Sequence, residues 1–127
     1  MTDRATIEGV LTDLYAARCS GDLSRLCGLF DVGASFRIAG TSAGKPIAMS
    51  ARGMSDIRPW LALLIKSFRV SDQSILSLLI DGNKVAVHWQ ANILSRITGA
   101  VVSTELFDLV EVRERLIVAY VELFLPR

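Results

Sequence analysis

The second half of the sequence consists of strand-like runs separated by turn sequences, and this pattern constrains the fold most. Each run is rich in β-branched and apolar residues. The runs are separated by Asp81-Gly82-Asn83, Thr98-Gly99 and Arg113-Glu114-Arg115, and turn residues between such runs predict hairpins. The expected result is a meander of four antiparallel strands over residues 70–80, 84–97, 100–112 and 116–125.

The first half has helical periodicity. Its first apolar stripe recurs at i, i+3, i+4, i+7 and i+11, which predicts an amphipathic helix. The stripe consists of Ile7, Val10, Leu11, Leu14 and Arg18. Gly21 is suited to end this helix with a left-handed cap, and Asp22 is suited to begin a short second helix. The second stripe, which Gly33 is expected to end, consists of Leu23, Leu26, Cys27 and Phe30.

A short strand and a third helix complete the first half. Residues Ala34–Ala39 alternate, with Phe36 and Ile38 on one face. The small residues of 39–53 predict a flexible loop. A third apolar stripe predicts a helix with Pro59 in its first turn or at a kink. This stripe consists of Ile57, Trp60, Leu61, Leu64, Ile65 and Phe68.

The order of these elements defines the fold class. Three helices with one strand among them, followed by four consecutive strands, predict an α+β fold with the helices packed on one face of a curved sheet. A strongly curved sheet that is covered by helices is expected to enclose a pocket. With 127 residues, the chain is expected to form one domain, residues 1–127.

Composition excludes several classes of protein. The formal net charge of +1 argues against a dedicated nucleic-acid binder, which would carry a basic stripe. The longest apolar runs, Trp60–Ile65 and Leu116–Val121, have six residues, whereas a membrane helix needs about 20. We therefore expect no nucleic-acid partner and no membrane partner. The start of the sequence has no apolar leader, which predicts a cytoplasmic protein, and Cys19 and Cys27 are expected to be free thiols.

Glu105 is the main candidate for an acid or base. Alternation on the preceding strand predicts an inner face of Val85, Val87, Trp89, Ala91 and Ile93, and places His88 on the outer face. On the next strand, one of the two alternating sets contains the large apolar side chains of Phe107 and Leu109. This set is therefore expected to form the inner face; it consists of Val101, Ser103, Glu105, Phe107 and Leu109. A carboxyl in apolar surroundings has a raised pKa and suits a general acid. A glutamate that reaches water or pairs with an arginine is the alternative.

The register of the last strand leaves two alternatives. In one register, Tyr120 and Glu122 share the inner face with Glu105, so that two carboxylates share a pocket and one stays protonated near neutral pH. A slip of one residue sends both outside and turns Ala119, Val121 and Leu123 inward.

Apolar residues also occupy the faces expected to point outward. On the strand expected over residues 70–80, one face carries Ile75 and Leu79 and the other face carries Leu76, Leu78 and Ile80. On the strand expected over residues 100–112, the outer set contains Val102, Leu106 and Val110. Such a patch indicates an interface. We predict a homodimer formed through the outer face of the sheet.

No motif in the sequence implies a metal or a cofactor. Gly40–Lys45 has three residues between its glycines where a phosphate-binding loop needs four. The single histidine, His88, has no metal-ligand spacing around it. The aromatic residues Tyr15, Trp60, Phe68 and Trp89 fit either a ligand pocket or an ordinary core.

The order of motifs resembles that of a known superfamily. Cys19-Ser-Gly-Asp22 lies between two helices, the second ends at Leu29-Phe30, and Gly53-x-x-x-Ile57 opens a third helix before the meander. This resembles the nuclear transport factor 2-like superfamily, and within it the SnoaL-like polyketide cyclases and ketosteroid isomerases. The resemblance implies a cone of three helices on a strongly curved, mixed but mostly antiparallel sheet, a pocket between them, and a dimer formed through the sheet.

The resemblance also implies positions for a ketosteroid isomerase site. In that family, a tyrosine and a neutral carboxylic acid hold the substrate oxygen while an aspartate acts as base. The tyrosine falls at Leu14, beside Tyr15, the base falls at Ile38, and the neutral acid falls at Glu105. One position of three keeps its chemistry, so that the family's isomerase reaction is not expected here.

Two functions from different classes fit these observations. The first is a cofactor-free isomerase, cyclase, dehydratase or hydrolase of a small hydrophobic substrate, with Glu105 as acid or base and Tyr120, Glu122 or Tyr15 as its partner. The second is a module that binds a hydrophobic ligand or a protein without catalysis. The side chains expected to line the ligand pocket are Tyr15, Ile38, Trp60, Trp89, Ser103 and Phe107.

Overall fold

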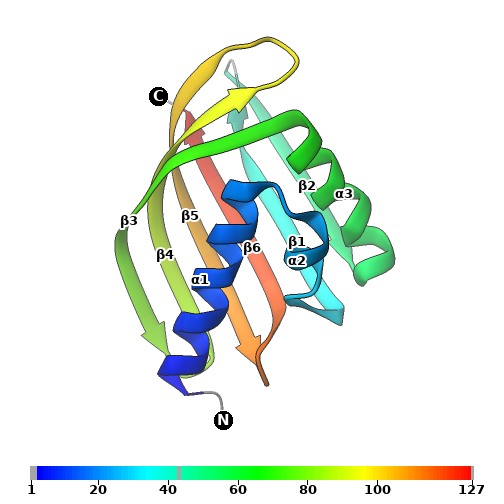
Figure 1. Ribbon diagram of the computed structural model, residues 1–127, viewed down its shortest axis with the longest axis vertical. Helices are drawn as coiled ribbons and strands as arrows, with labels where there is room; N and C mark the ends of the chain where they lie inside the picture. The colour runs from blue at the N-terminus through cyan, green and yellow to red at the C-terminus, as the bar shows by residue number, and fades with distance from the viewer. Residues whose placement is uncertain (1–2, 43, 127) are drawn as a thin grey trace.

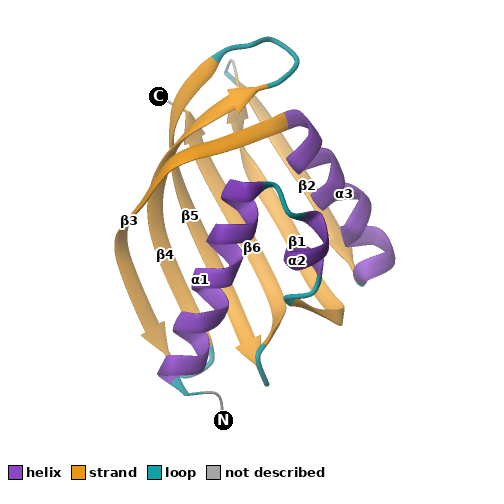
Figure 2. Ribbon diagram, viewed as in Figure 1, coloured by secondary structure: helices purple, strands orange, loops and turns teal. Residues whose placement is uncertain are grey.

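The described residues fold into three helices and six strands (Figure 1). The structure is a computed structural model that describes residues 3–42 and 44–126. The elements are α1 (Arg4–Ser20), α2 (Leu23–Cys27), β1 (Phe30–Ser42), β2 (Lys45–Arg52), α3 (Met54–Ser67), β3 (Phe68–Asp81), β4 (Lys84–Ser95), β5 (Val101–Arg113) and β6 (Leu116–Pro126). The helices lie on one side of the curved sheet (Figure 2), which confirms the α+β class.

Capping residues set the boundaries of the first two helices, and two of them, Gly21 and Asp22, were predicted. The Asp3 carboxylate accepts a hydrogen bond from the backbone N–H of Thr6 and begins α1. Gly21 ends α1 with a φ of 69°, a left-handed conformation that glycine adopts without strain. Asp22 caps α2 as predicted. Among the described residues, no helix has the length and apolar character needed to cross a membrane.

Several features of the first half differ from the sequence-based expectation, and the first of them is that β1 begins at Phe30, a residue expected in the second helix, rather than at Ala34. Residues 39–53 are not a loop, because β2 forms a hairpin with β1 there and Gly44 adopts a positive φ at its tip. β2 is an exposed edge strand, and such a strand is held by backbone hydrogen bonds without needing apolar alternation. α2 ends at Cys27, well before Gly33, and Pro59 lies beyond the first turn of α3.

The sheet has the strand order β2-β1-β6-β5-β4-β3. The last four strands form the predicted antiparallel meander, and β1 pairs with β6 in parallel, so the sheet is mixed and mostly antiparallel. Figure 1 shows the sheet curving around α1. This curvature brings side chains of α1 over the centre of the sheet.

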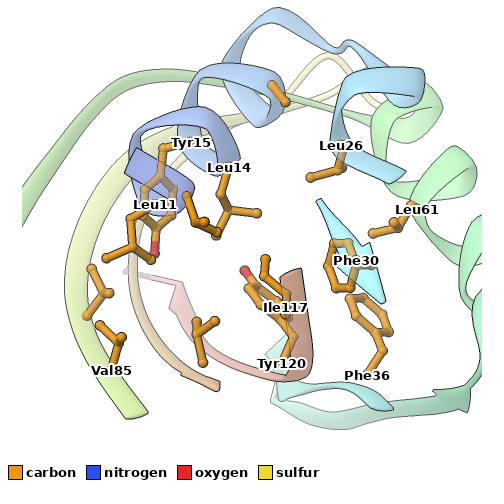
Figure 3. Packing of buried hydrophobic residues seen from close by; sticks show 14 of the residues in the cluster. Leu11, Leu14, Tyr15, Leu26, Phe30, Phe36, Leu61, Val85, Ile117 and Tyr120 are labelled. Carbon is orange, nitrogen blue, oxygen red and sulfur yellow. The ribbon is translucent and has the colours of Figure 1, made fainter. Parts of the chain in front are cut away.

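One apolar core fills the space between the helices and the sheet. Figure 3 shows Leu14, Leu26, Phe30 and Tyr120 pointing toward one another in this space. The rings of Phe36 and Tyr120 stack with centroids 5.7 Å apart. The enclosed pocket expected here stays a prediction.

The outer face of the sheet carries apolar side chains, but on β5 they are not the predicted ones, because Leu106 and Val110 are buried. Leu79, Leu109 and Leu123 are exposed on it. Leu79, Leu109 and Val121 also line a hollow of about 320 Å³ on this face. Dimerisation through this face stays a prediction.

Gly40 on β1 is a position where packing requires glycine. It pairs with Phe124 of β6, and a Cβ atom at Gly40 would lie 2.5 Å from the Phe124 carbonyl oxygen and 2.7 Å from its ring. We expect Gly40→Ala to destabilise the protein by about 1–3 kcal/mol, the usual cost of overpacking. Urea unfolding measures this change.

Gly9 provides the matched control for this substitution. It lies within α1, and a Cβ atom there would meet no atom within 4 Å. Gly9→Ala should therefore stabilise the protein by about 1 kcal/mol through helix propensity. Equal stability of the Gly40→Ala variant and the wild type would contradict the close packing of Phe124.

Candidate active site

Asp108 of β5 lies at the centre of a buried polar cluster. Its side chain is fully buried, although it is polar and its surroundings are apolar. Three groups donate hydrogen bonds to its Oδ2 atom: the Tyr15 hydroxyl at 2.7 Å, the Trp89 indole N–H at 2.9 Å and the Tyr120 hydroxyl at 3.0 Å. Its Oδ1 atom is buried and has no hydrogen-bond partner among the described residues.

Glu122 of β6 forms a buried ion pair with Arg18 of α1. Two nitrogens of the Arg18 guanidinium donate to its carboxylate, at 2.7 and 3.4 Å. The Tyr120 hydroxyl donates to Glu122 at 2.6 Å and accepts from Arg18 at 3.2 Å. The Arg18 guanidinium also lies 5.7 Å from the centre of the Trp89 ring, close enough for a cation–π contact.

Local structure explains how these side chains converge. Tyr15 and Arg18 are three residues apart on α1 and therefore lie on the same helix face. Asp108 lies directly opposite Glu122 in the antiparallel pair of β5 and β6, so both point to the same side of the sheet. Tyr120 precedes Glu122 by two residues and shares its face. The curvature of the sheet places this face against α1.

The cluster carries one positive charge and two carboxyl groups. Burial raises the pKa of Asp108 well above its usual value, and the neighbouring charge of Glu122 raises it further. Burial alone would also raise the pKa of Glu122, but the charge and hydrogen bonds of Arg18 lower it below its usual value. The two shifts move the pKa values of the carboxyls apart, so that Asp108 holds its proton to a higher pH than Glu122 does.

This arrangement places an acid and a base side by side. The Tyr120 hydroxyl lies within hydrogen-bond distance of both carboxyls and can give its single proton to only one of them at a time. It therefore links the carboxyl of Asp108, whose pKa is raised, to that of Glu122, whose pKa is lowered. Arg18 is partly exposed, with 12% of its side chain accessible, whereas the side chain of Glu122 is only 4% exposed.

The inner face predicted for β5 is wrong. Thr104, Leu106, Asp108 and Val110 are the buried residues of this strand. Their neighbours Val101, Ser103, Glu105, Phe107 and Leu109, which were expected to point inward, lie on the outer face. The register explains the inversion, because Trp89 pairs with Leu106 and His88 pairs with Phe107, and paired residues share a face. With apolar residues on both faces, hydrophobicity alone selects the wrong set.

Glu105 consequently lies apart from the buried cluster. Its carboxylate lies 3.0 Å from the His88 ring, which stacks on Phe107 with centroids 4.3 Å apart. The side chains of His88 and Glu105 are 30% and 24% exposed. The predicted pair of Glu105 and Glu122 does not form, because the carboxyl that lies opposite Glu122 is that of Asp108.

The structure brings together most of the other predicted residues. Tyr120 and Glu122 point inward, as in the first of the two registers, and Tyr15 and Trp89 contact Asp108. Ile38 lies in the core next to this group, and Trp60 packs against the core from α3. Ser103 and Phe107, predicted to contact a ligand inside, lie on the outer face.

Sequence reasoning missed the roles of Arg18 and Asp108. Arg18 belongs to the apolar stripe of the first helix, and a charge on such a stripe indicates a buried partner. Asp108 required the register of β5, which residue patterning does not supply. Both cysteines are free, Cys27 buried and Cys19 exposed. Across residues 3–42 and 44–126, no three His, Cys, Asp or Glu side chains are grouped in a way that could hold a metal ion.

Comparison with solved structures shows the same fold in proteins of low sequence identity. A structure from Bacillus subtilis named "Putative Isomerase" has 18% identity and a TM-score of 0.83, covering 98% of this chain and 90% of its own. An LEH-like epoxide hydrolase from M. tuberculosis has 12% identity and a TM-score of 0.72, covering 94% and 83%. An NTF2-like protein from Burkholderia xenovorans has 18% identity and a TM-score of 0.68, covering 98% and 92%.

Comparison of the sequence with families gives the assignment. No curated protein matches the sequence. The model of the SnoaL-like domain family matches residues 11–120, which include every member of the buried cluster except Glu122. Because this match covers most of the sequence, the chain belongs to the SnoaL-like domain family.

Proposed function

We propose that the protein is a cofactor-free acid–base enzyme that isomerises or hydrolyses a small, largely apolar substrate bearing an oxygen atom. One observation carries this proposal: Asp108 and Glu122 lie buried and directly opposite each other on adjacent strands, and their surroundings shift their pKa values in opposite directions. Two carboxyls whose pKa values are moved apart by their surroundings provide an acid and a base together. The apolar core around them favours an apolar substrate.

Each group has a role in such a reaction. In an isomerisation, the Glu122 carboxylate takes a proton from a carbon beside a carbonyl group and returns it to a different carbon. Arg18 stabilises the negative charge that develops on the carbonyl oxygen. In the hydrolysis of an epoxide, Glu122 takes a proton from the attacking water as the water oxygen bonds to carbon and the C–O bond of the epoxide breaks. The released oxygen receives a proton from the Asp108 carboxyl, whose Oδ1 atom has no other partner among the described residues. The solved relatives named as an isomerase and as an epoxide hydrolase support these two reactions.

A panel of epoxides and β,γ-unsaturated ketones tests the proposal. We expect the wild type to convert at least one compound, either to an isomer of the same mass or to a product that has gained water. Glu122→Gln should lower kcat/KM by about 10²–10⁴-fold, because it removes the base while keeping the shape of the side chain. Circular dichroism at the assay temperature establishes that the variant is folded.

Glu105→Gln provides the matched control, since it makes the same chemical change on the outer face of the neighbouring strand. Its kcat/KM should stay within about twofold of the wild type, because surface changes away from the reacting groups have small effects. Equal losses in the two variants, or no turnover by the wild type with any compound, would contradict the proposal.

Binding without catalysis is the second candidate function, and the complete burial of Asp108 favours it. A hydrogen-bonded network sealed inside a core can serve stability alone. In that case, an apolar ligand raises the melting temperature, by an amount that grows with the logarithm of its concentration relative to its Kd, and no product forms. Mass analysis of the recovered ligand separates the two functions.

A further inference from the structure

One end of the molecule carries exposed apolar side chains. The strand pairings bring together the last residues of β1, β4 and β6 and the first residues of β2, β3 and β5, at the top of the view in Figure 1. We call this region the apolar end. Its exposed apolar residues are Ile47 (39% exposed), Phe68 (42%), Leu125 (51%), Val101 (62%) and Ile97 (85%).

The charged residues of the apolar end are all basic. Segments 38–50, 63–71 and 93–104 contain no Asp or Glu. They contain Lys45, Lys66, Arg69 and Arg96. None of these four forms an ion pair with another described residue. Since the net charge of the whole chain is +1, the rest of the chain is net negative, and the positive charge is concentrated at this end.

Ile97 is the most unusual residue of the apolar end. It lies in the turn between β4 and β5, between Arg96 and Thr98, where polar residues and glycine are usual. A large apolar side chain that is 85% exposed in a turn stabilises nothing inside the fold. Exposed apolar groups rimmed by charge mark interaction surfaces.

We propose that the apolar end docks on the surface of an anionic lipid bilayer. Apolar side chains that enter the boundary between headgroups and acyl chains, flanked by Lys and Arg, provide the two forces that hold peripheral proteins on such membranes. A second copy of the chain fits less well, because a two-fold contact through this end would place one basic rim against the other. The short apolar runs argue against a segment that crosses a membrane, so the proposed contact is with the bilayer surface only. This proposal differs from the earlier prediction that the protein has no membrane partner. It does not depend on catalysis by Glu122.

Co-sedimentation with vesicles tests this docking. We expect the protein to bind vesicles of phosphatidylcholine mixed with phosphatidylglycerol, to bind phosphatidylcholine alone much more weakly, and to dissociate as salt is added. Arg96→Gln should weaken binding about fivefold, the contribution of one basic residue near the surface. Ile97→Ser should weaken it about tenfold or more through loss of apolar burial.

Two variants at the opposite end are matched controls. Val32, at the start of β1, is 81% exposed, so Val32→Ser repeats the change made at Ile97. Arg115→Gln, in the exposed turn between β5 and β6, repeats the change made at Arg96. Both controls should bind like the wild type, allowing for the small effect of net charge. The proposal is overturned by an absence of binding to anionic vesicles, by equal losses in test and control variants, or by a dimer that Ile97→Ser abolishes.

Discussion

Replacing Arg18 with methionine should destabilise the protein by about 3–5 kcal/mol, the usual cost of breaking a buried ion pair on one side. The Arg18 side chain is 12% exposed and that of Glu122 is 4% exposed, so the Glu122 carboxylate left without its partner cannot reach water without opening the fold. Methionine keeps most of the length and volume of the side chain. The loss therefore reports on charge and hydrogen bonding more than on packing. Unfolding in urea at neutral pH measures it.

Two further variants separate this effect from a general effect of removing an arginine. Arg25 pairs with Asp13 at 2.9 Å, but both side chains are about half exposed. Arg25→Met should therefore cost less than about 1 kcal/mol. Combining Arg18→Met with Glu122→Leu should recover much of the lost stability, because the buried charge is removed together with its partner. If Arg18→Met and Arg25→Met cost the same, the ion pair at Glu122 is not held as the structure shows.

The stability of the protein should fall as pH rises above about 5, and Asp108 should be the cause. Its pKa in the folded state lies well above the ordinary value of 3.8, so the folded protein keeps a proton that the unfolded chain releases. Between these two pKa values, the free energy of unfolding decreases by about 1.4 kcal/mol per pH unit for one such group. The contribution of Asp108 to the free energy of unfolding is complete below its pKa in the unfolded chain and is lost as pH rises through its pKa in the folded protein.

The titration of Glu122 changes the stability in the opposite direction and over a different pH range. Its pKa is lowered from 4.5 in the folded state, so its contribution is complete above that value and is lost as pH falls through the folded pKa. Above about pH 5, the change attributable to the pair therefore comes from Asp108. Because two interacting carboxyls titrate together, the measured midpoint belongs to the pair.

Asp108→Asn isolates this contribution. The asparagine oxygen can accept hydrogen bonds from Tyr15 and Trp89, and its amide can take the place of the carboxyl proton. The variant should match the wild type near pH 5 and lose less stability as pH rises to 8. Denaturant unfolding at a series of pH values gives both slopes. Parallel curves would show that Asp108 is ionised in the folded protein.

The features predicted from the sequence are those that local chemistry determines. Caps at Gly21 and Asp22 have local geometric requirements that single residues satisfy. Alternation predicted the faces of β4 because its outer residues are polar at His88, Gln90 and Asn92. The hairpin turn at 81–83 was predicted for the same kind of reason, since its residues favour a reversal of the chain.

The face of β5 could not be predicted in the same way. Leu109 is 53% exposed and Leu106 is buried, yet their hydrophobicity is the same. Which of the two points inward depends on how β5 pairs with β4, a contact between residues far apart in sequence. The position of Asp108 depended on that pairing, so Glu105 was favoured in its place. Arg18 could have been identified earlier, because it interrupts an apolar helical stripe.

The parallel pairing of β1 with β6 affects how the fold is assembled during synthesis. β6 lies between β1 and β5, so the earlier strands emerge as two separate pieces, a hairpin of β1 and β2 and a meander of β3 to β5. Until β6 joins them, Arg18 lacks Glu122 and Asp108 lacks Tyr120. Long-range pairing of this kind slows folding, because the chain must close a large loop before it gains the contacts. The edges of β1 and β5 that pair with β6 therefore stay unpaired until β6 has been synthesised.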